Sequence, residues 1–375
     1  MSLSIDVVSS AGDVRDFLAL PHRLYGDTPQ WVPEFRADLR RVIRRKHPIF
    51  AHAMAEFFLV KRGLTPVVRG AVVINDAYNR AHGLQCASFY YFDAKKDSAA
   101  VRLFFATVQD WARARGMNEL RGPMMFGGTS GSGILVDGFD RQAAMTMMRY
   151  NHPYYGPLLE DVGFEPLVDL YSAEFSQGSL RLPTRVSRIA EIAAKRGRIS
   201  VQSFKNKREL KAAVPGIKAL YNQTLADHIE DYPLSHEELD AVAKELLTVA
   251  DPRLIKLLRE GEKIIGFLFA FPDLSPALRK NRGRLGPIAA ARLMLSFRRA
   301  RRVLFNGMGI LPRYQRRGGN ALLYAELAET VKSRGFTDAE IVQVAGETTM
   351  MLRDLKNLGA SIHKTHRIYK MPYSV

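Results

Sequence analysis

The sequence predicts an α/β protein built as two tandem units, each with a mixed sheet flanked by helices. Three observations predict it. Apolar patterns follow the order strand, helices, hairpin, strand, helix, strand, helix, strands. The same order recurs in the second half, and a polar, irregular stretch at residues 176–185 separates the halves. The 375 residues exceed one ordinary domain and suffice for two, so we expect units at 1–178 and 186–375.

The first half begins this order with a short alternating strand and two helical patterns. Two apolar runs around a turn then predict a hairpin. The helix at 101–115 places Val101, Phe104 and Phe105 on one face, and Gly116 ends it. The expected elements are a strand at 4–8, helices at 14–24 and 31–43, a hairpin of 56–62 with 67–74, a strand at 87–92, the helix at 101–115, a strand at 119–125, a helix at 157–162 and a strand at 167–175.

The second half repeats the pattern, and its helix ends match those of the first. Gly335 ends one helix as Gly116 does, and Gly359 ends the next as Gly163 does. The expected elements are a strand at 199–204, a helical region at 207–229, a hairpin of 253–259 with 263–271, a strand at 303–311, helix 321–334, strand 339–344, helix 348–358 and a strand pair within 361–371. The matches in register indicate a duplication.

Composition limits the class of protein. Apolar residues make up 47% and charged residues 25% of the chain, which is typical of a globular protein. No apolar run reaches the length of a membrane helix, the N-terminus lacks a signal-peptide pattern, and the single Cys86 excludes an internal disulfide or a cysteine metal cluster. We therefore expect a cytoplasmic protein without a metal.

Positive charge is the first functional signal. Lys and Arg number 55 against 38 Asp and Glu, a net charge of +17. Such a surplus favours a polyanionic partner: nucleic acid, an anionic membrane surface or a phosphorylated cofactor. No acidic residue occurs at 275–325, a stretch that holds twelve Lys and Arg.

One local motif carries chemistry. The strand at 303–311 ends at Pro312, a basic loop with Arg313, Arg316 and Arg317 follows, and a helix begins after Gly318-Gly319. Free amides and the positive end of the dipole at a helix start bind anions, so the pattern predicts a pyrophosphate site. It matches neither a Walker loop nor a Rossmann fingerprint.

Pro-x-Tyr-Gln-x-x-Gly before a helix resembles the acetyl-CoA-binding motif Gln/Arg-x-x-Gly-x-Gly/Ala of the GCN5-related N-acetyltransferase (GNAT) superfamily. Gln315, Gly318 and Asn320 fill its three positions with a departure at the last, and a second register through Arg316, Gly319 and Ala321 fills them literally. Both registers stay open. More narrowly, the chain resembles tandem bacterial acyltransferases that include bacterial ceramide synthases, on the segments at 29–33 and 150–155.

The resemblance implies an acyl-CoA N-acyltransferase. Acyl-CoA would be held by Gln315, Arg316, Arg317, Gly318, Gly319, Asn320 and Ala321, and a backbone N–H near Gly309, Ile310 or Leu311 would bind the thioester oxygen. The corresponding loop of the first half, residues 93–98, has two aspartates and no glycine. We therefore expect one cofactor site, in the second unit. The glycine-rich stretch at 127–133 is interpreted as a loop, and Cys86 is not expected to act as a nucleophile.

We expect the general base within residues 226–233, which the fold of the resembled family would place on the acceptor side. His228 suits the role best by type, Asp231 is an alternative beside Asp227 and Glu230, and a solvated helix end remains another interpretation. Asn306 lies on the strand before the loop and points either towards the site or away from it.

A basic, apolar insert suggests the acceptor. Residues 279–302 combine arginines with the apolar run 287–297, as in segments that lie on an anionic leaflet. This predicts a long-chain acyl group, a lipid amine of sphingoid type, and peripheral attachment to the inner face of the membrane. The alternatives are a small-amine N-acetyltransferase, an aminoacyl-tRNA-linked transferase and a non-catalytic nucleic-acid-binding protein. Nucleic acid is not expected, because no RNA motif or recognition helix is visible.

Overall fold

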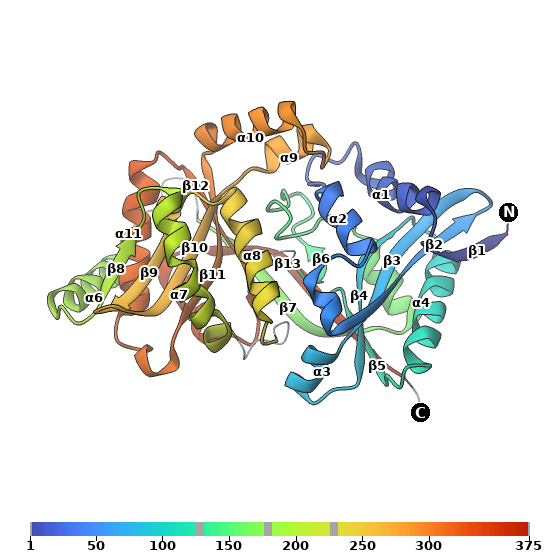
Figure 1. Ribbon diagram of the computed structural model, residues 1–375, viewed down its shortest axis with the longest axis horizontal. Coiled ribbons are helices and arrows are strands. Elements are labelled where there is room, and N and C mark those ends of the chain that lie inside the picture. The colour runs from blue at the N-terminus through green and yellow to red at the C-terminus, as the bar shows by residue number, and fades with distance from the viewer. Residues whose placement is uncertain (1, 125–130, 176–181, 226–231, 374–375) are drawn as a thin grey trace. The chain divides into compact units, whose positions relative to one another are not determined.

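The computed structural model describes residues 2–124, 131–175, 182–225 and 232–373 (Figure 1). It has two compact units. The first comprises 1–170, 275–293 and 364–375, and the second comprises 171–274 and 294–363. Each unit thus takes segments from both halves of the sequence, and the strands β7 (Glu165–Glu174) and β13 (Ser361–Pro372) contribute residues to both.

The first unit is built on a mixed sheet. The strands β1 (Leu3–Val7), β2 (Ala53–Arg62), β3 (Thr65–Asn75) and β4 (Cys86–Ala94) pair antiparallel in chain order, and β4 runs parallel to β5 (Glu119–Gly122). The C-terminal part of β13 pairs antiparallel with β5, and β6 (Ile134–Asp137) also pairs with β13. The segment at 361–371 was predicted as a strand pair, and that prediction is wrong. It is one strand, because no glycine or proline turn interrupts its alternation.

Helices cover both faces of this sheet. Helix α4 (Ser98–Arg113) packs on the face that carries Phe58 and Val60, whereas α1 (Ala11–Tyr25) and α2 (Arg36–Ile43) pack on the face of Phe57 and Leu59. The alternation of a half-buried strand separates the two sets. The unit also contains η1 (Pro48–Ala51), α3 (Asp76–His82), α5 (Tyr155–Val162) and α9 (Ser275–Asn281).

The helix predicted at 31–43 is shorter in the structure. Residues 31–35 have no regular secondary structure and α2 begins at Arg36, whose amide donates to the Gly283 carbonyl at 2.9 Å. Pro33 disfavours a helical conformation at the residue before it, so the segment enters the helix only after this turn.

The second unit repeats the plan. Its strands β8 (Ser200–Ser203), β9 (Ile255–Glu260), β10 (Lys263–Pro272) and β11 (Arg302–Ile310) pair antiparallel, and β11 runs parallel to β12 (Asp338–Ala345). Hairpin, strand, helix and parallel strand therefore recur in one order, and the predicted tandem α/β fold is confirmed.

Two layers of helices flank this second sheet. Helix α11 (Gly319–Ser333) packs on α6 (Thr184–Lys195) and β9, while α7 (Lys207–Leu225) packs on β10 with α8 (His236–Val249) beside it (Figure 1). The remaining elements are η2 (Pro252–Leu254), α10 (Pro287–Arg299), η3 (Pro312–Tyr314) and α12 (Thr349–Leu358).

Candidate functional site

The two parallel strands of the second unit separate halfway along their length. Residues 302–305 of β11 pair with residues 338–341 of β12, yet β11 continues to Ile310 and β12 to Ala345. Beyond Phe305 the β11 strand bulges against β10, and Gly307 there has a φ of +119°, a conformation that side chains disfavour. Beyond the bulge no pairing of β11 with β12 is recorded, and we call the region between residues 306–310 and 342–345 the gap.

One backbone amide of β11 faces this gap. The Leu311 amide donates to the Ile265 carbonyl of β10 at 2.9 Å. Because amides alternate between the two edges of a strand, the Gly309 amide also faces β10 and the Ile310 amide faces the gap. The Ile310 carbonyl lies on the same edge and accepts a hydrogen bond from Gln315 Nε2 at 3.1 Å. Of the three amides expected to bind a thioester oxygen, that of Ile310 is the one on the strand edge that faces away from β10.

The basic loop follows directly and leads into a helix start. Gly318 is the N-cap of α11 with φ +84°, and Arg316 also has a positive φ of +61°. The guanidinium groups of Arg313 and Arg317 lie over the Tyr314 ring at 5.1 and 5.2 Å, and the Tyr314 hydroxyl donates to Glu260 at 2.7 Å. These contacts hold exposed arginines around the first amides of α11, an arrangement suited to a pyrophosphate.

The two glycines of the loop are also required by packing. A Cβ atom on Gly319 would lie 2.5 Å from Leu258 Cδ2, and one on Gly318 would lie 3.0 Å from Ala193 Cβ. The Asn320 amide group donates to Asp354 of α12 at 2.9 Å, while Ala321 is buried. Asn320 and Ala321 can therefore face an anion only through their backbone.

The predicted catalytic residues are placed only in part. His228 and Asp231, with Asp227 and Glu230, lie outside the described residues. Asn306 is half-buried in the bulge of β11, beside Gly307 at the start of the gap. The glycine-rich loop also lies outside the described residues over 125–130.

An apolar pocket opens on the α7 and α8 side of the second unit. It encloses about 520 Å³, part of it open to solvent. Its lining is aliphatic and aromatic apart from Lys218: Leu210, Val214, Ile217, Lys218, Tyr221, Leu239, Val242, Ala243, Leu246, Leu247, Ala250, Ile255, Phe269 and Phe271. Sequence reasoning missed this pocket, because its walls come from separate segments spread over residues 210–271.

A stack of rings joins this pocket to the gap. Tyr221 stacks on Phe267 at 6.1 Å between centroids, and Phe267 stacks on Phe269 at 4.3 Å. A Cβ atom on Gly309 would lie 3.0 Å from the Phe267 ring and 2.6 Å from Thr224. Gly309 therefore lets α7 and the aromatic stack approach β11 one residue before Ile310.

A buried charged cluster was also missed. Glu340 of β12 is fully buried, lies 3.2 Å from His363 Nε2 and pairs with Arg302. Leu304 pairs with Phe271 on one side and with Glu340 on the other, so Glu340 and Phe271 lie on one face of the sheet. The signal in the sequence is a carboxylate inside the apolar strand 339–344. The cluster offers an imidazole and a carboxylate for proton transfer.

The first unit has the same gap. Its β4 and β5 strands pair only over Cys86–Ser88, Tyr91 has a positive φ of +53°, and the Lys95 amide donates to the Val67 carbonyl at 2.8 Å. Leu311 follows Gly307 by four residues, as Lys95 follows Tyr91. Ala94 of the first unit therefore corresponds to Ile310 of the second.

Side chains close this first gap. The Ala94 amide donates to the Tyr155 hydroxyl at 2.8 Å, and the Tyr154 hydroxyl donates to the Ala94 carbonyl at 2.9 Å. Asp97 caps α4 by accepting from the Ala100 amide, which occupies the helix start where the second unit has glycine. The groups that would receive a thioester and a pyrophosphate are thus engaged within the protein.

Both aspartates of the corresponding loop in the first unit are paired with arginines. Asp93 is buried and pairs with Arg69 at 2.7 Å, and Asp97 pairs with Arg62 at 2.8 Å. Both charges are compensated, so the first unit differs from the second by the hydrogen bonds at Ala94 and the cap at Asp97 and not by a surplus of negative charge. Cys86 is buried, and burial raises the pKa of its thiol to about 12, which keeps it protonated and unreactive.

The described residues also bear on a metal site and on a membrane-spanning helix. Among the described residues, no group of three or more His, Cys, Asp or Glu side chains is arranged to hold a metal ion. Within the same residues, no helix is both long and apolar enough to cross a bilayer.

The comparisons with known proteins agree with the fold. No family model matches the chain. A protein named bacterial ceramide synthase from Caulobacter vibrioides is 26% identical over 381 residues, which span 98% of this chain and 97% of that protein. The tandem GNAT protein of the clavulanic acid biosynthesis pathway, solved without acetyl-CoA, gives a TM-score of 0.57 at 11% identity over 100% of this chain and 99% of that one. A GCN5-related N-acetyltransferase from Sphaerobacter thermophilus gives a TM-score of 0.50 at 12% identity, over 99% of this chain and 95% of that one. The resemblance that rested on Gln315 and Gly318 is thereby confirmed for the fold.

Proposed function

We propose that the protein is an acyl-CoA-dependent N-acyltransferase that uses the second unit for the thioester and a lipid amine as acceptor. The gap between β11 and β12 carries the proposal, because it presents the Ile310 amide immediately before an arginine-rich helix start. The pyrophosphate would lie at the first turn of α11, with Arg316 and Arg317 beside it. The thioester would then reach into the gap.

The reaction needs few groups. The amine attacks the thioester carbonyl, a C–N bond forms, and the carbonyl oxygen becomes an oxyanion that the Ile310 N–H stabilises. The C–S bond then breaks, the CoA thiolate leaves, and the nitrogen loses its proton to a base. No covalent acyl-enzyme is required, in agreement with the protonated state of Cys86.

Two candidates for the base follow from different observations. His228, with Asp231 as its alternative, is favoured by residue type and by the place of its segment in the sequence. The pair of His363 and Glu340 is favoured by burial and by its position on the acceptor face. Asn306, in the bulge, would orient the substrate by hydrogen bonding.

The apolar pocket supports a lipid amine. Its lining would enclose a hydrocarbon chain, and the Tyr221–Phe267–Phe269 stack leads from it towards Gly309 and the reacting groups. A small soluble amine has no use for such a pocket, and an aminoacyl-tRNA would require basic rather than apolar walls. The name of the Caulobacter relative supports an amide of ceramide type.

Helix α10 supports peripheral attachment to a membrane. Ala289 faces the protein, while Ile288, Met294 and Leu295 are large apolar side chains exposed to solvent. Arg292, Arg298 and Arg299 are exposed on the same helix. Exposed apolar side chains interspersed with arginines are suited to an anionic leaflet, where each basic residue contributes about 1 kcal/mol.

A substrate panel tests the function. The purified protein is given acyl-CoAs of two to eighteen carbons, each with a sphingoid amine or with a polyamine, and amide products are identified by mass spectrometry. We expect long-chain amides of the sphingoid amine and release of one CoA per amide. Acetylation of the polyamine without turnover of long chains would reject the lipid acceptor and keep the acyltransferase. Absence of any CoA-dependent amide would reject both.

A further inference from the structure

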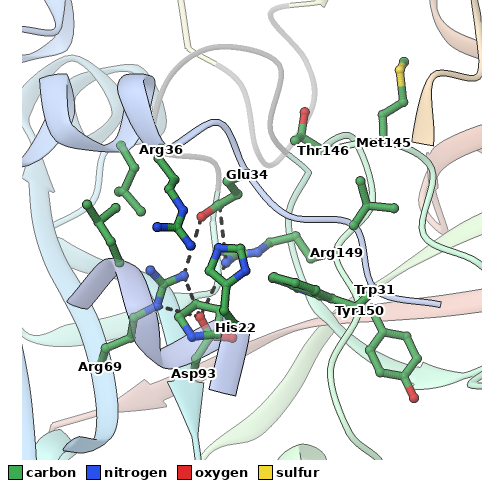
Figure 2. A pocket seen from close by; sticks show the side chains of 14 residues that line it. His22, Trp31, Glu34, Arg36, Arg69, Asp93, Met145, Thr146, Arg149 and Tyr150 are labelled. Atoms are coloured by element: carbon green, nitrogen blue, oxygen red, sulfur yellow. Dashed lines mark hydrogen bonds and ion pairs between the residues drawn. The ribbon is translucent and has the colours of Figure 1, made fainter. Parts of the chain in front are cut away.

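The first unit contains a second pocket that the acyl-transfer chemistry does not use. It lies on the sheet face covered by α1 and α2 and encloses about 510 Å³, part of it open to solvent. Figure 2 shows its lining, which is mostly charged and aromatic. This composition contrasts with the apolar pocket of the second unit.

Two arginines and two carboxylates form a compensated part of the lining. Arg69 lies 2.7 Å from Asp93 and 3.5 Å from Glu34, and Arg149 lies 3.4 Å from Glu34 and 3.9 Å from Asp93 (Figure 2). Arg69 also donates to the Phe17 carbonyl at 3.0 Å, and Arg149 lies over the Tyr90 ring. Two cations thus match two anions, and this network leaves no surplus charge.

A third arginine of the lining, Arg36, has no ion pair with a carboxylate among the described residues. Arg36 lines the pocket, and its guanidinium points inward (Figure 2). Its Nε atom is buried and has no hydrogen-bond partner within the described parts of the chain. A buried guanidinium nitrogen without an acceptor is costly, so the position is suited to an acceptor from a ligand.

A tight turn brings further arginines to the same place. The Arg36 amide donates to the Gly283 carbonyl, and a Cβ atom on Gly283 would lie 2.1 Å from the Glu34 carbonyl oxygen. Gly283 has a φ of +68°, so only glycine readily allows this approach. Arg282 and Arg284 flank it and are exposed. Burial lowers the pKa of Arg36, and so do Arg284, Arg40 and Arg282, which shows that these like charges gather around it.

We propose that this pocket binds a phosphate-class oxyanion, with Arg36, Arg282 and Arg284 as its charged partners. His22 lines the pocket as a neutral imidazole and can donate an N–H to the oxyanion. The phosphate can belong to a soluble phosphomonoester or to a phospholipid headgroup. A phospholipid headgroup fits the chain that follows the turn, because the apolar side chains of Leu285 and Ile288 are 57% and 70% exposed and could contact a lipid surface. This inference does not rest on the acyl-transfer function.

Trp31 in the pocket wall provides the readout. The chain has two tryptophans, so Trp111→Phe leaves Trp31 as the single fluorophore. The Trp111→Phe variant is titrated at constant ionic strength with inorganic phosphate, sn-glycerol 3-phosphate, phosphatidylglycerol vesicles and phosphatidylcholine vesicles. We expect a saturable change in emission with at least one phosphate-bearing anion and none with phosphatidylcholine. A response to glycerol phosphate indicates a soluble phosphomonoester, and a response to phosphatidylglycerol vesicles alone indicates a headgroup.

Matched variants separate the site from general charge effects. Arg282→Gln with Arg284→Gln changes exposed side chains only and should weaken binding at least tenfold, as should Arg36→Gln. Arg80→Gln, exposed on α3, should leave the titration unchanged. Far-ultraviolet circular dichroism and melting confirm that each variant is folded. No saturable response to any phosphate, or an equal response in the Arg282/Arg284 variant, would overturn the proposal.

Discussion

In the first unit the Tyr155 hydroxyl accepts a hydrogen bond from the Ala94 amide at 2.8 Å, whereas among the described residues of the second unit no side chain accepts one from the corresponding Ile310 amide. Tyr155 is fully buried and also bonds with Tyr25, whose hydroxyl donates to Asp93 at 3.0 Å. Burial raises the pKa of Tyr155 well above its usual value, so the hydroxyl keeps its proton. As far as the described residues go, the two units therefore differ in whether a side chain occupies this strand edge.

The Ile310 amide is expected to act in the transition state. Ile310→Pro removes this N–H without removing a ladder bond, because the amide faces away from β10. Loss of one oxyanion donor typically lowers kcat by about 100- to 1,000-fold. Steady-state kinetics should show that loss with the KM for acyl-CoA little changed. Ile310→Val keeps the amide and is the control; equal activity of the two variants would contradict the assignment.

Filling the apolar pocket should weaken the lipid acceptor selectively. Ala243→Trp adds bulk to the pocket wall, and each methylene denied burial costs about 0.8 kcal/mol. We expect the KM for a long-chain amine to rise roughly tenfold or more, and the KM for acyl-CoA to stay constant. Lys244→Trp, exposed on the same helix, is the control. A rise in the KM for acyl-CoA alone would place the acyl chain in the pocket instead of the acceptor.

Membrane attachment should depend on the exposed face of α10. Arg298→Glu with Arg299→Glu should release the protein from anionic vesicles in a flotation assay, and Ile288→Ser with Leu295→Ser should weaken attachment. Arg302 is left unchanged, because it pairs with Asp273 and the buried Glu340. The double replacement of Arg298 and Arg299 by Lys keeps the charge and should still float. If the unaltered protein does not float with such vesicles, attachment through α10 is wrong.

Stability should fall as the pH is lowered towards 4. Burial lowers the pKa of His22 from 6.5 to about 4, with further lowering by Arg36 and other arginines. The unfolded chain therefore binds a proton between these values that the folded chain does not, so acid favours unfolding. The charged groups around His22 are Arg36, Arg69, Arg282 and Arg284, with Glu34, Asp93 and Arg149 in the same pocket.

The size of this effect can be measured by urea unfolding between pH 7 and pH 4. One pKa unit corresponds to about 1.4 kcal/mol, and solvent reaching the half-buried ring reduces the total to roughly 1 to 3 kcal/mol. His22→Gln should remove this part of the loss. An unchanged pH dependence in the variant would show that His22 is not the group responsible.

The sequence predicts the hairpins and the helix after the basic loop because each depends on local pattern, whereas the helices α3, α6, α8, α9 and α10 were not among the expected elements. The hairpins follow from apolar runs around short turns, and α11 follows from Gly318, Gly319 and the apolar positions after them. The choice among Gly309, Ile310 and Leu311 could not be made in advance. It depends on the bulge at Asn306 and Gly307, which shifts the register of β11 against β10.

Contacts between residues far apart in the chain could also not be predicted from the sequence. The Tyr155 hydroxyl bonds with the Ala94 amide, 61 positions away in the chain. Asp93 pairs with Arg69, which lies opposite it on the neighbouring strand. Long-range pairs of this kind leave no periodic signal. The buried Glu340 did leave a signal in the sequence, because it is a carboxylate within an otherwise apolar strand.

A single CoA site in the second unit is the central claim. Isothermal titration calorimetry with CoA should give one site per chain. Arg316→Glu with Arg317→Glu should weaken it by about tenfold or more, because each lost charge-assisted contact costs about 1.5 to 3 kcal/mol. These exposed positions are preferable to Gly318 and Gly319, where an added side chain would press on Ala193 or Leu258. Lys95→Glu with Lys96→Glu makes the same charge change in the equivalent turn of the first unit and should leave the affinity unchanged. Two sites per chain, or weakening by the Lys95/Lys96 change alone, would contradict a single thioester site in the second unit.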